Sequence, residues 1–156
     1  MDITIDVEDY KLNVRAGAVI IHNNKVLLHR NLNSDHYAIL GGRISIGENS
    51  EETVKRELLE ELGREIEITG YIATVENFFE MKGSKYHEIM FIHKAEFVNE
   101  ADKNLTDTME NLEGKDYLKY EWIEIDEIDK YPLRPEVMKE ILKEKVFPVH
   151  KINIDM

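Results

Sequence analysis

The stretch that decides the fold runs from Gly42 to Gly63 and reads GRISIGENSEETVKRELLEELG. Its first part is a glycine-bearing loop, and its second part has the apolar spacing of an amphipathic helix. Asn49 and Ser50 are favourable N-cap residues, and the two glutamates that follow suit the first turn. Gly63 stands where a left-handed residue ends a helix. The stretch therefore predicts a loop and then a helix that ends at Leu62.

One side of this helix carries clustered acids. At about 100° per residue, three glutamates share an arc of about 100°, and an apolar stripe lies next to them. The glutamates are Glu57, Glu60 and Glu61, and the stripe is Val54, Leu58 and Leu62. Like charges at these spacings destabilise an isolated helix, whereas hard oxygen ligands on a rigid element suit Mg²⁺ or Mn²⁺. Taken alone, the same pattern also fits a solvated acidic face with a routine Arg56–Glu60 ion pair.

The rest of the chain alternates β-type runs with turns. Asn23-Asn24 is a tight-turn signal, so the runs on either side of it predict a hairpin. The polar, acidic residues 99–117 predict a long loop. Strands are expected over residues 15–22, 25–30, 37–40 (stopping at Gly41-Gly42), 66–79, 86–97 and 120–125, and a second helix over 136–145. No repeat, low-complexity segment or linker divides the chain, which predicts one domain over residues 1–156.

Composition and charge exclude several classes of protein. The chain of 156 residues is 42% hydrophobic and 33% charged, which suits a folded globular domain. Its formal net charge of -12 disfavours a groove for polymeric nucleic acid, and no apolar run approaches the roughly 20 residues of a membrane helix. The absence of Cys excludes disulfides, thiolate zinc sites and a cysteine nucleophile. The acidic N-terminus does not resemble a secretory signal, so a cytoplasmic location is the default expectation.

The loop and helix together resemble the signature of the Nudix hydrolases, the MutT-like family. That signature is G-x5-E-x7-R-E-U-x-E-E-x-G-U, where U is apolar. The matching residues are Gly42, Glu48, Arg56, Glu57, Leu58, Glu60, Glu61 and Gly63. The last apolar position of the signature is occupied here by Arg64. In addition, Ile39-Leu40-Gly41-Gly42 stands where many members have Leu-Pro-Gly-Gly. Neither departure touches a carboxylate, so we interpret both as differences in packing and loop stiffness.

The resemblance implies an α/β/α sandwich with a mixed central sheet and a divalent-metal-dependent hydrolase. Glu57, Glu60 and Glu61 would bind Mg²⁺ (or Mn²⁺), and a metal-activated water would attack a phosphorus atom. Glu60 is the candidate base. Glu48 and Arg56 resemble the pair that fixes the loop on the helix, so the predicted catalytic residues are Glu60, Glu57, Arg56 and Glu48.

Other residues are weaker candidates for the site. Glycines allow a backbone to approach a ligand closely, and arginines can contact phosphate, so the predicted substrate-binding residues are Gly41, Gly42, Arg43 and Arg30, with Arg15 as a further arginine. A later acid often completes the site in the family; the candidates are Glu110, Glu113 and Asp116, with Glu76, Glu80 and Glu88 as rivals. His87 and Glu88 are adjacent strand residues and should point to opposite faces. The aromatic residues Trp122, Tyr71, Phe78 and Phe79 are expected to be core or dimer contacts.

The resemblance therefore predicts cleavage of the diphosphate linkage in a nucleoside diphosphate derivative. NTPs or dNTPs, oxidised nucleotides and nucleotide sugars all remain open as substrates. The expected partners are a small nucleotide and, as in many members, a second copy of the chain. A catalytically silent nucleotide-binding module and an acidic interaction protein are the alternatives, while a diphosphate isomerase of this fold would need the Cys that the chain lacks.

Overall fold

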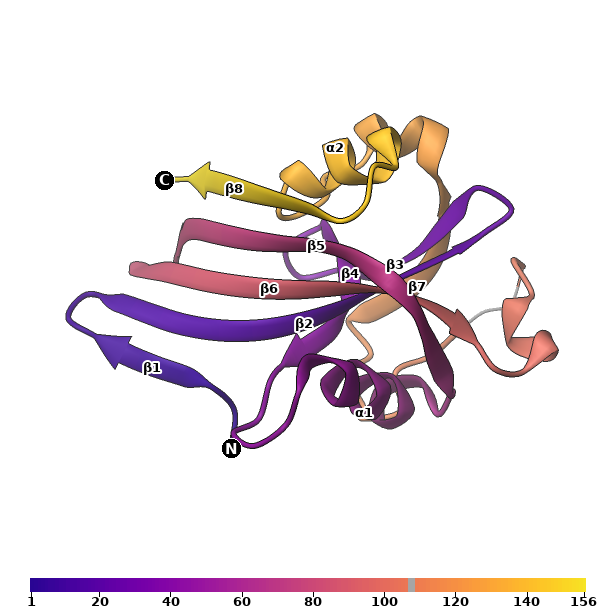
Figure 1. Ribbon diagram of the computed structural model, residues 1–156, viewed down its shortest axis with the longest axis horizontal. Coiled ribbons are helices and arrows are strands. Elements are labelled where there is room, and N and C mark those ends of the chain that lie inside the picture. The colour runs from indigo at the N-terminus through magenta and orange to yellow at the C-terminus, as the bar shows by residue number, and fades with distance from the viewer. Residues whose placement is uncertain (107–108) are drawn as a thin grey trace.

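In the computed structural model, which describes residues 1–106 and 109–156, a mixed sheet lies between two helices (Figure 1). Its strands follow the order β7-β3-β4-β2-β6-β5-β8, and β1 pairs with β2. The β2–β6 and β5–β8 pairs are parallel and the others antiparallel. The strands are β1 (Thr4–Val7), β2 (Tyr10–His22), β3 (Lys25–Asn31), β4 (His36–Arg43), β5 (Ile66–Met81), β6 (Ser84–Phe97), β7 (Leu118–Glu124) and β8 (Val149–Asp155). The α/β/α sandwich with a mixed sheet is thus confirmed.

Helix α1 (Ser50–Leu62) forms where the sequence predicts it, because both of its ends are capped locally. Asn49 accepts a hydrogen bond from the Glu52 amide at 2.9 Å, and Glu52 accepts one from the Asn49 amide at 3.0 Å. Gly63 ends the helix with φ at 66°, a left-handed conformation that glycine adopts without strain. Val54 and Leu58 are fully buried, so the apolar stripe packs on the sheet as expected.

Each face of the sheet has its own hydrophobic core, and each core is closed by one helix. The α1 face buries residues such as Leu27, Leu40, Leu58 and Phe97. The opposite face is covered by α2 (Val137–Glu144) and the 3-10 helix η2 (Ile125–Lys130), and buries residues such as Ile72, Ile92, Ile128 and Met138. The α1 and α2 layers lie on opposite sides of the strands in Figure 1.

The structure corrects the prediction that the third strand stops before Gly41-Gly42. β4 continues through both glycines to Arg43, because Gly41 pairs with Gly17 and Gly42 with Ala16 of β2. A side chain on Gly41, whose φ is 148°, would collide with the backbone of β2. Only glycine therefore fits at this position of β4.

Several elements lie beyond the predicted boundaries. β2 begins at Tyr10 rather than at Arg15, and neither β1 nor β8 was expected. The predicted loop over 99–117 contains the short 3-10 helix η1 (Glu100–Lys103), and its residues 107–108 lie outside the described residues. The end of this loop packs on α1, where the Leu112 amide donates to the Glu61 carbonyl oxygen at 2.7 Å.

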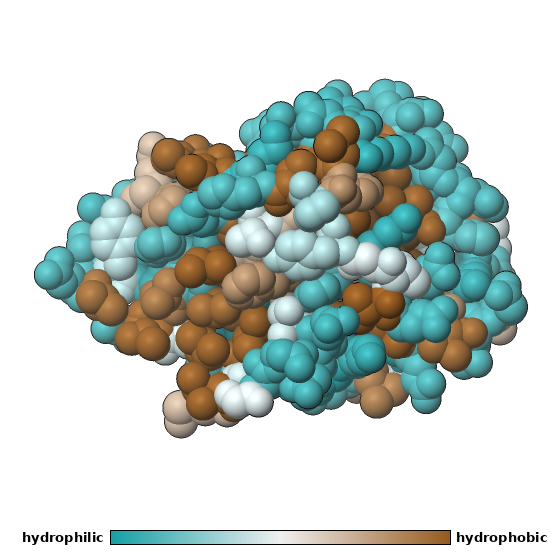
Figure 2. All heavy atoms as spheres, viewed as in Figure 1, coloured by the Kyte–Doolittle hydropathy of each residue, from teal (hydrophilic) through white to brown (hydrophobic). Residues whose placement is uncertain are grey.

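The surface in Figure 2 is hydrophilic over much of its area, but hydrophobic side chains gather over the strand ends away from α1. The exposed apolar residues of the outer strands are Ile5 and Val7 of β1 and Ile152 and Ile154 of β8. These side chains belong to strands. Within the described part of the chain, no helix is both long enough and apolar enough to cross a membrane.

Candidate active site

A bidentate ion pair between Arg56 and Glu48 holds the glycine loop against α1. Arg56 donates from Nε to Glu48 Oε2 at 2.7 Å and from Nη2 to Glu48 Oε1 at 2.9 Å. Thr53 donates to the same carboxylate at 2.7 Å, and Arg56 also reaches the Arg43 carbonyl oxygen at 3.4 Å. The hydrogen bonds from Arg56 lower the pKa of Glu48 to about 2, against the effect of burial. The pair therefore stays ionised and fixes the loop on the helix.

Gly42 makes room for the carboxylate of Glu57. A Cβ atom at Gly42 would lie 2.5 Å from Glu57 Oε1 and 2.8 Å from Glu57 Cγ. Glu57 is largely buried, and its Oε1 accepts a hydrogen bond from Arg56 Nη1 at 3.0 Å. Burial raises the pKa of Glu57, while the neighbouring guanidinium opposes that rise. The backbone of β4 and the acid of α1 thus meet only because residue 42 has no side chain.

Glu61 lies one helical turn beyond Glu57 and is only 6% exposed. Its Oε2 atom is buried and has no hydrogen-bond partner among the described residues. Burial, followed by the negative charge of Glu57, raises the pKa of Glu61 to about 7. A buried carboxylate oxygen without a partner is costly, and a proton or a cation relieves that cost.

Glu60, the third predicted metal ligand, is more exposed than Glu57 and Glu61. It is partly exposed, and Arg56 Nη1 donates to its Oε2 at 3.3 Å. Within residues 1–106 and 109–156, no three acidic or histidine side chains converge closely enough to hold a metal ion together. Arg56 Nη1 thus donates to both Glu57 and Glu60, whereas Glu61 Oε2 has no partner among the described residues.

The residues present nevertheless fit a hard divalent cation. Glu57 and Glu61 supply carboxylate oxygens on a rigid, capped helix, and the unpartnered Oε2 of Glu61 is an acceptor that such an ion would satisfy. Rotation of the exposed Glu60 side chain would add a third oxygen donor from the same helix face.

The candidate later acids fall into different regions. The negative charge of Glu113 acts on both Glu57 and Glu61, after the larger effect of burial, and raises the pKa of each. Glu110 and Asp116 are exposed positions of the same loop. Glu76 pairs with His150 at 2.7 Å, whereas Glu80 and Glu88 line a pocket described below. Among these candidates, Glu113 is therefore the acid whose charge acts on both helix acids.

The predicted phosphate-binding arginines are engaged elsewhere. Arg30 pairs with Asp35 at 2.6 Å, and Arg43 with Asp2 at 3.4 Å, so both point to exposed acids. Arg15 differs from them, because its Nε lies 3.9 Å from Glu88 Oε2 while its positive charge also acts on Glu61. Arg15 thus lines the pocket, and its charge also acts on the helix acid Glu61.

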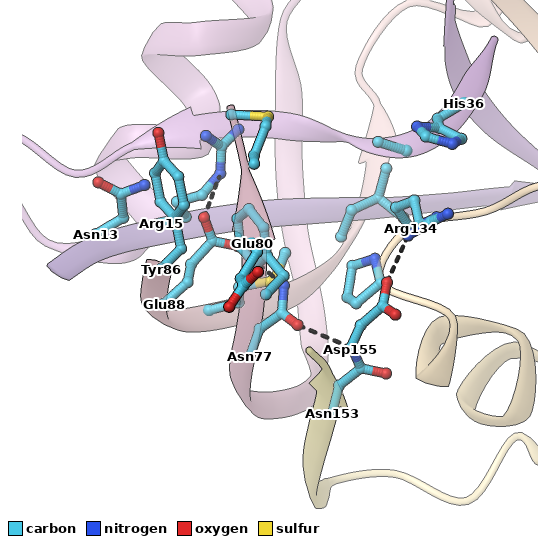
Figure 3. Close-up of a pocket in the computed structure, with 16 residues that line it drawn as sticks. Asn13, Arg15, His36, Asn77, Glu80, Tyr86, Glu88, Arg134, Asn153 and Asp155 are labelled. Carbon is cyan, nitrogen blue, oxygen red and sulfur yellow. Dashed lines mark hydrogen bonds and ion pairs between the residues drawn. The ribbon is translucent and has the colours of Figure 1, made fainter. Parts of the chain in front are cut away.

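The pocket has a volume of about 350 Å³ and opens on the face of the sheet that carries α2 (Figure 3). Ile39 and Met90 belong to its apolar wall, and both are part of the core on that face. The rings of Phe79 and Tyr86 stack at 4.7 Å with an interplanar angle of 3°. Phe79 therefore lines the pocket and is not part of either core, while a dimer contact at this residue stays a prediction.

Polar side chains form the floor of this pocket, two of them buried (Glu88 and Asn77) and one half-buried (Asn153). Glu88 comes from β6, Asn77 from β5 and Asn153 from β8 (Figure 3). The ring of His87 packs instead on Phe78 at 4.4 Å, so the opposite orientation of His87 and Glu88 agrees with the strand geometry predicted for them. Sequence reasoning missed Asn77 and Asn153, because isolated asparagines in strands carry no motif.

The fold and the loop–helix motif define an α/β/α sandwich with clustered acids on one helix. A family model described as NUDIX domain matches residues 11–144. Since this range covers most of the chain, the protein belongs to the Nudix hydrolase family.

Solved structures show the same fold. The ORF135 protein of E. coli is 24% identical, with a TM-score of 0.56 over 88% of this chain and 91% of that chain. A MutT protein from Methanosarcina mazei Go1 is 19% identical, with a TM-score of 0.62 over 89% and 95%. An ADP-ribose pyrophosphatase from Streptococcus suis is 13% identical, with a TM-score of 0.57 over 89% and 98%. At these identities the likeness concerns the fold.

Proposed function

We propose that this Nudix protein is a divalent-cation-dependent hydrolase that cleaves the diphosphate linkage of a nucleoside diphosphate derivative. The observation that carries the proposal is the buried Oε2 atom of Glu61, which has no hydrogen-bond partner among the described residues. It lies one helical turn from Glu57, whose carboxylate packs on Gly42 at the end of β4. Family membership supports a hydrolase, and one structural neighbour is named as a pyrophosphatase. NTPs or dNTPs, oxidised nucleotides and nucleotide sugars are the substrate types within this proposal.

The proposal gives each side chain a role. Glu57, Glu60 and Glu61 would hold Mg²⁺ or Mn²⁺, which when bound supplies charge neutralisation at phosphate and a more acidic water. Glu60 is exposed and can leave Arg56, so it is the carboxylate proposed to accept a proton. Glu48 and Arg56 hold the loop and the helix in register. Glu113 is proposed as the acid that completes the site.

Arg15 and the pocket are proposed to bind the remainder of the substrate. A diphosphate near Glu61 would lie within the field of Arg15, whose other neighbour, Glu88, lines the pocket. One ligand could therefore extend from the helix acids into a cavity of about 350 Å³, a volume typical of small-molecule sites.

A hydrolysis screen tests this function. Purified protein with Mg²⁺ is incubated with NTPs, dNTPs, 8-oxo-dGTP and nucleotide sugars, and both products are identified to establish the bond that is cut. We expect cleavage between two phosphorus atoms, and we expect Glu60→Gln to lower the rate by about 10²-fold or more. The control is Glu51→Gln, which changes an exposed acid in the first turn of the same helix and should leave the rate unchanged.

A catalytically silent nucleotide-binding module is the second candidate, favoured by the contact that holds Glu60 on Arg56. It predicts that nucleotide raises the melting temperature while no substrate in the screen is cleaved and Glu60→Gln changes nothing. That outcome would reject the hydrolase.

The proposal treats residues 1–156 as one domain, since β1 and β8 lie outside the matched range and still join the sheet. The homodimer and the cytoplasmic location stay predictions. Sedimentation at several protein concentrations would test the homodimer.

A further inference from the structure

The pocket on the α2 face contains a buried acid that the proposed chemistry does not use. Glu88 is 6% exposed and lies at the floor of the cavity (Figure 3). Glutamate is almost never buried to this extent unless it is paired. A role for Glu88 must therefore account for a carboxylate placed inside a largely apolar pocket.

The contacts that Glu88 makes within the protein are long. Asn77 Nδ2 donates to Oε1 at 3.5 Å, and Arg15 Nε lies 3.9 Å from Oε2. Charge-assisted hydrogen bonds to a carboxylate normally measure about 2.7–2.9 Å. Because an ionised carboxylate offers about four lone-pair sites, both oxygens of Glu88 keep strong acceptor capacity toward the cavity.

The neighbouring amides fix this arrangement. Asn153 Nδ2 donates to Asn77 Oδ1 at 2.9 Å, which orients the Asn77 amide so that its NH₂ group faces Glu88. The Val137 amide at the start of α2 in turn donates to Asn153 Oδ1 at 3.4 Å. This series of hydrogen bonds links three strands and a helix, and it therefore holds Glu88 in a defined position as an acceptor.

We propose that Glu88 is a specificity-determining residue that accepts two adjacent hydrogen bonds from the non-phosphate part of the substrate. This inference rests on the proposed function, because it assumes that a nucleotide reaches from the helix acids past Arg15 into the pocket. Two groups of a nucleotide carry such a donor pair. One is the Watson–Crick edge of guanine, with its N1–H and N2–H donors, and the other is the cis-diol of ribose.

The walls of the pocket suit the flat part of such a ligand. The stacked rings of Phe79 and Tyr86 and the apolar side chains of Ile39 and Met90 line the same cavity. Among the standard bases, only guanine presents two neighbouring N–H donors on one edge. A carboxylate at the floor, rather than an amide, would therefore select against adenine, cytosine and hypoxanthine.

Calorimetric binding of three nucleoside monophosphates, without divalent cation, tests the proposal separately from catalysis. IMP lacks the N2 donor of GMP, and dGMP lacks the 2′-hydroxyl. Loss of a hydrogen bond to a charged group weakens binding about 10-fold to 100-fold. We expect the wild-type protein to prefer GMP over IMP if the base edge is read, or GMP over dGMP if the diol is read.

Glu88→Gln replaces one acceptor oxygen by a donor and should abolish whichever preference the wild-type protein shows. Glu96→Gln is the matched control, because Glu96 is an exposed acid of the same strand that does not line the pocket, and it should keep the preference. Equal wild-type affinities for all three ligands, including no measurable binding, would overturn the proposal without recourse to any variant. A preference that survives Glu88→Gln would also overturn it.

The two levels of inference fail in different ways. If GMP is preferred through Glu88 but no diphosphate is cleaved, the hydrolase is wrong and the role of Glu88 stands. If diphosphates are cleaved in a Mg²⁺-dependent manner while GMP, IMP and dGMP bind alike, the hydrolase stands and the role of Glu88 is wrong.

Discussion

Replacing Gly42 by alanine is a direct test of the site, because the new methyl group would enter the space of the Glu57 carboxylate. The Cβ atom would lie 2.5 Å from Glu57 Oε1, whereas ordinary contact begins near 3.4 Å. Since Glu57 Cδ would be closer still, the carboxyl group must retreat by about 1 Å. Gly42 does not have a positive φ, so the backbone of β4 accepts alanine without strain.

The expected effect is large on activity and small on stability. A misplacement of about 1 Å in a catalytic constellation can cost about 10²-fold in rate, and we expect Gly42→Ala to lose activity on that scale. Mg²⁺ should also bind more weakly, since Glu57 is one of the helix carboxylates proposed to hold the ion. The free energy of unfolding should change by less than about 1 kcal/mol, because Glu57 yields at the end of a flexible side chain. Calorimetric Mg²⁺ titration, hydrolysis rates and thermal melts measure the three quantities.

Gly70→Ala is the matched control. Gly70 lies in a strand, also without a positive φ, and its Cβ would meet only Lys94 at 3.6 Å, an ordinary contact. This variant should keep the wild-type rate and Mg²⁺ affinity. If Gly42→Ala also keeps both, the reasoning that places Glu57 in the cation site is refuted.

Three further predictions concern the helix. Glu48→Gln should lower the free energy of unfolding at pH 7 by about 2 kcal/mol. The pKa of Glu48 is about 2, below its ordinary 4.5, so in urea melts the wild-type protein should be more stable than the variant above pH 4.5 and should lose this extra stability toward pH 2. Burial raises the pKa of Glu61 to about 7, so the Mg²⁺ affinity measured by calorimetry should fall about tenfold per pH unit below pH 7. The free energy of unfolding of the cation-free protein should instead rise as the pH falls from 7 toward 4.5. A Mg²⁺ affinity that does not change with pH would contradict this reasoning. Leu58→Ala, at a fully buried position, should cost about 2–5 kcal/mol in the same melts, and Leu59→Ala, 53% exposed, about 0.5 kcal/mol or less; equal losses would refute the helix orientation.

The elements predicted best from the sequence are those whose signals are local. Asn49, Glu52 and Gly63 cap α1 through contacts within a few residues, so its bounds follow from the sequence. The outer strands β1 and β8 were missed for different reasons. β1 pairs with β2 across a tight turn at Glu8 and Asp9, which is not one of the common hairpin-turn signals, whereas β8 has no partner nearby in the sequence. β8, for example, pairs with β5, more than seventy residues earlier in the chain. The place of β8 in the sheet depends on contacts between distant segments, which periodicity does not encode.

The same division applies to the site. The sequence by itself determined that Glu57, Glu60 and Glu61 share one helix face beside a glycine loop, because helical spacing and family pattern are properties of adjacent residues. Only the tertiary structure decided that Glu61 is buried, with an Oε2 atom that has no partner among the described residues, and that Gly42 leaves space for Glu57.

The pocket also belongs to the tertiary structure alone. Glu88, Asn77 and Asn153 come from three strands, and only the order of those strands in the sheet brings them to one floor. The physical reason is that a helix sets the directions of its side chains within its own few turns. A sheet, by contrast, sets its neighbours through long-range pairing, which is specified by the fold as a whole.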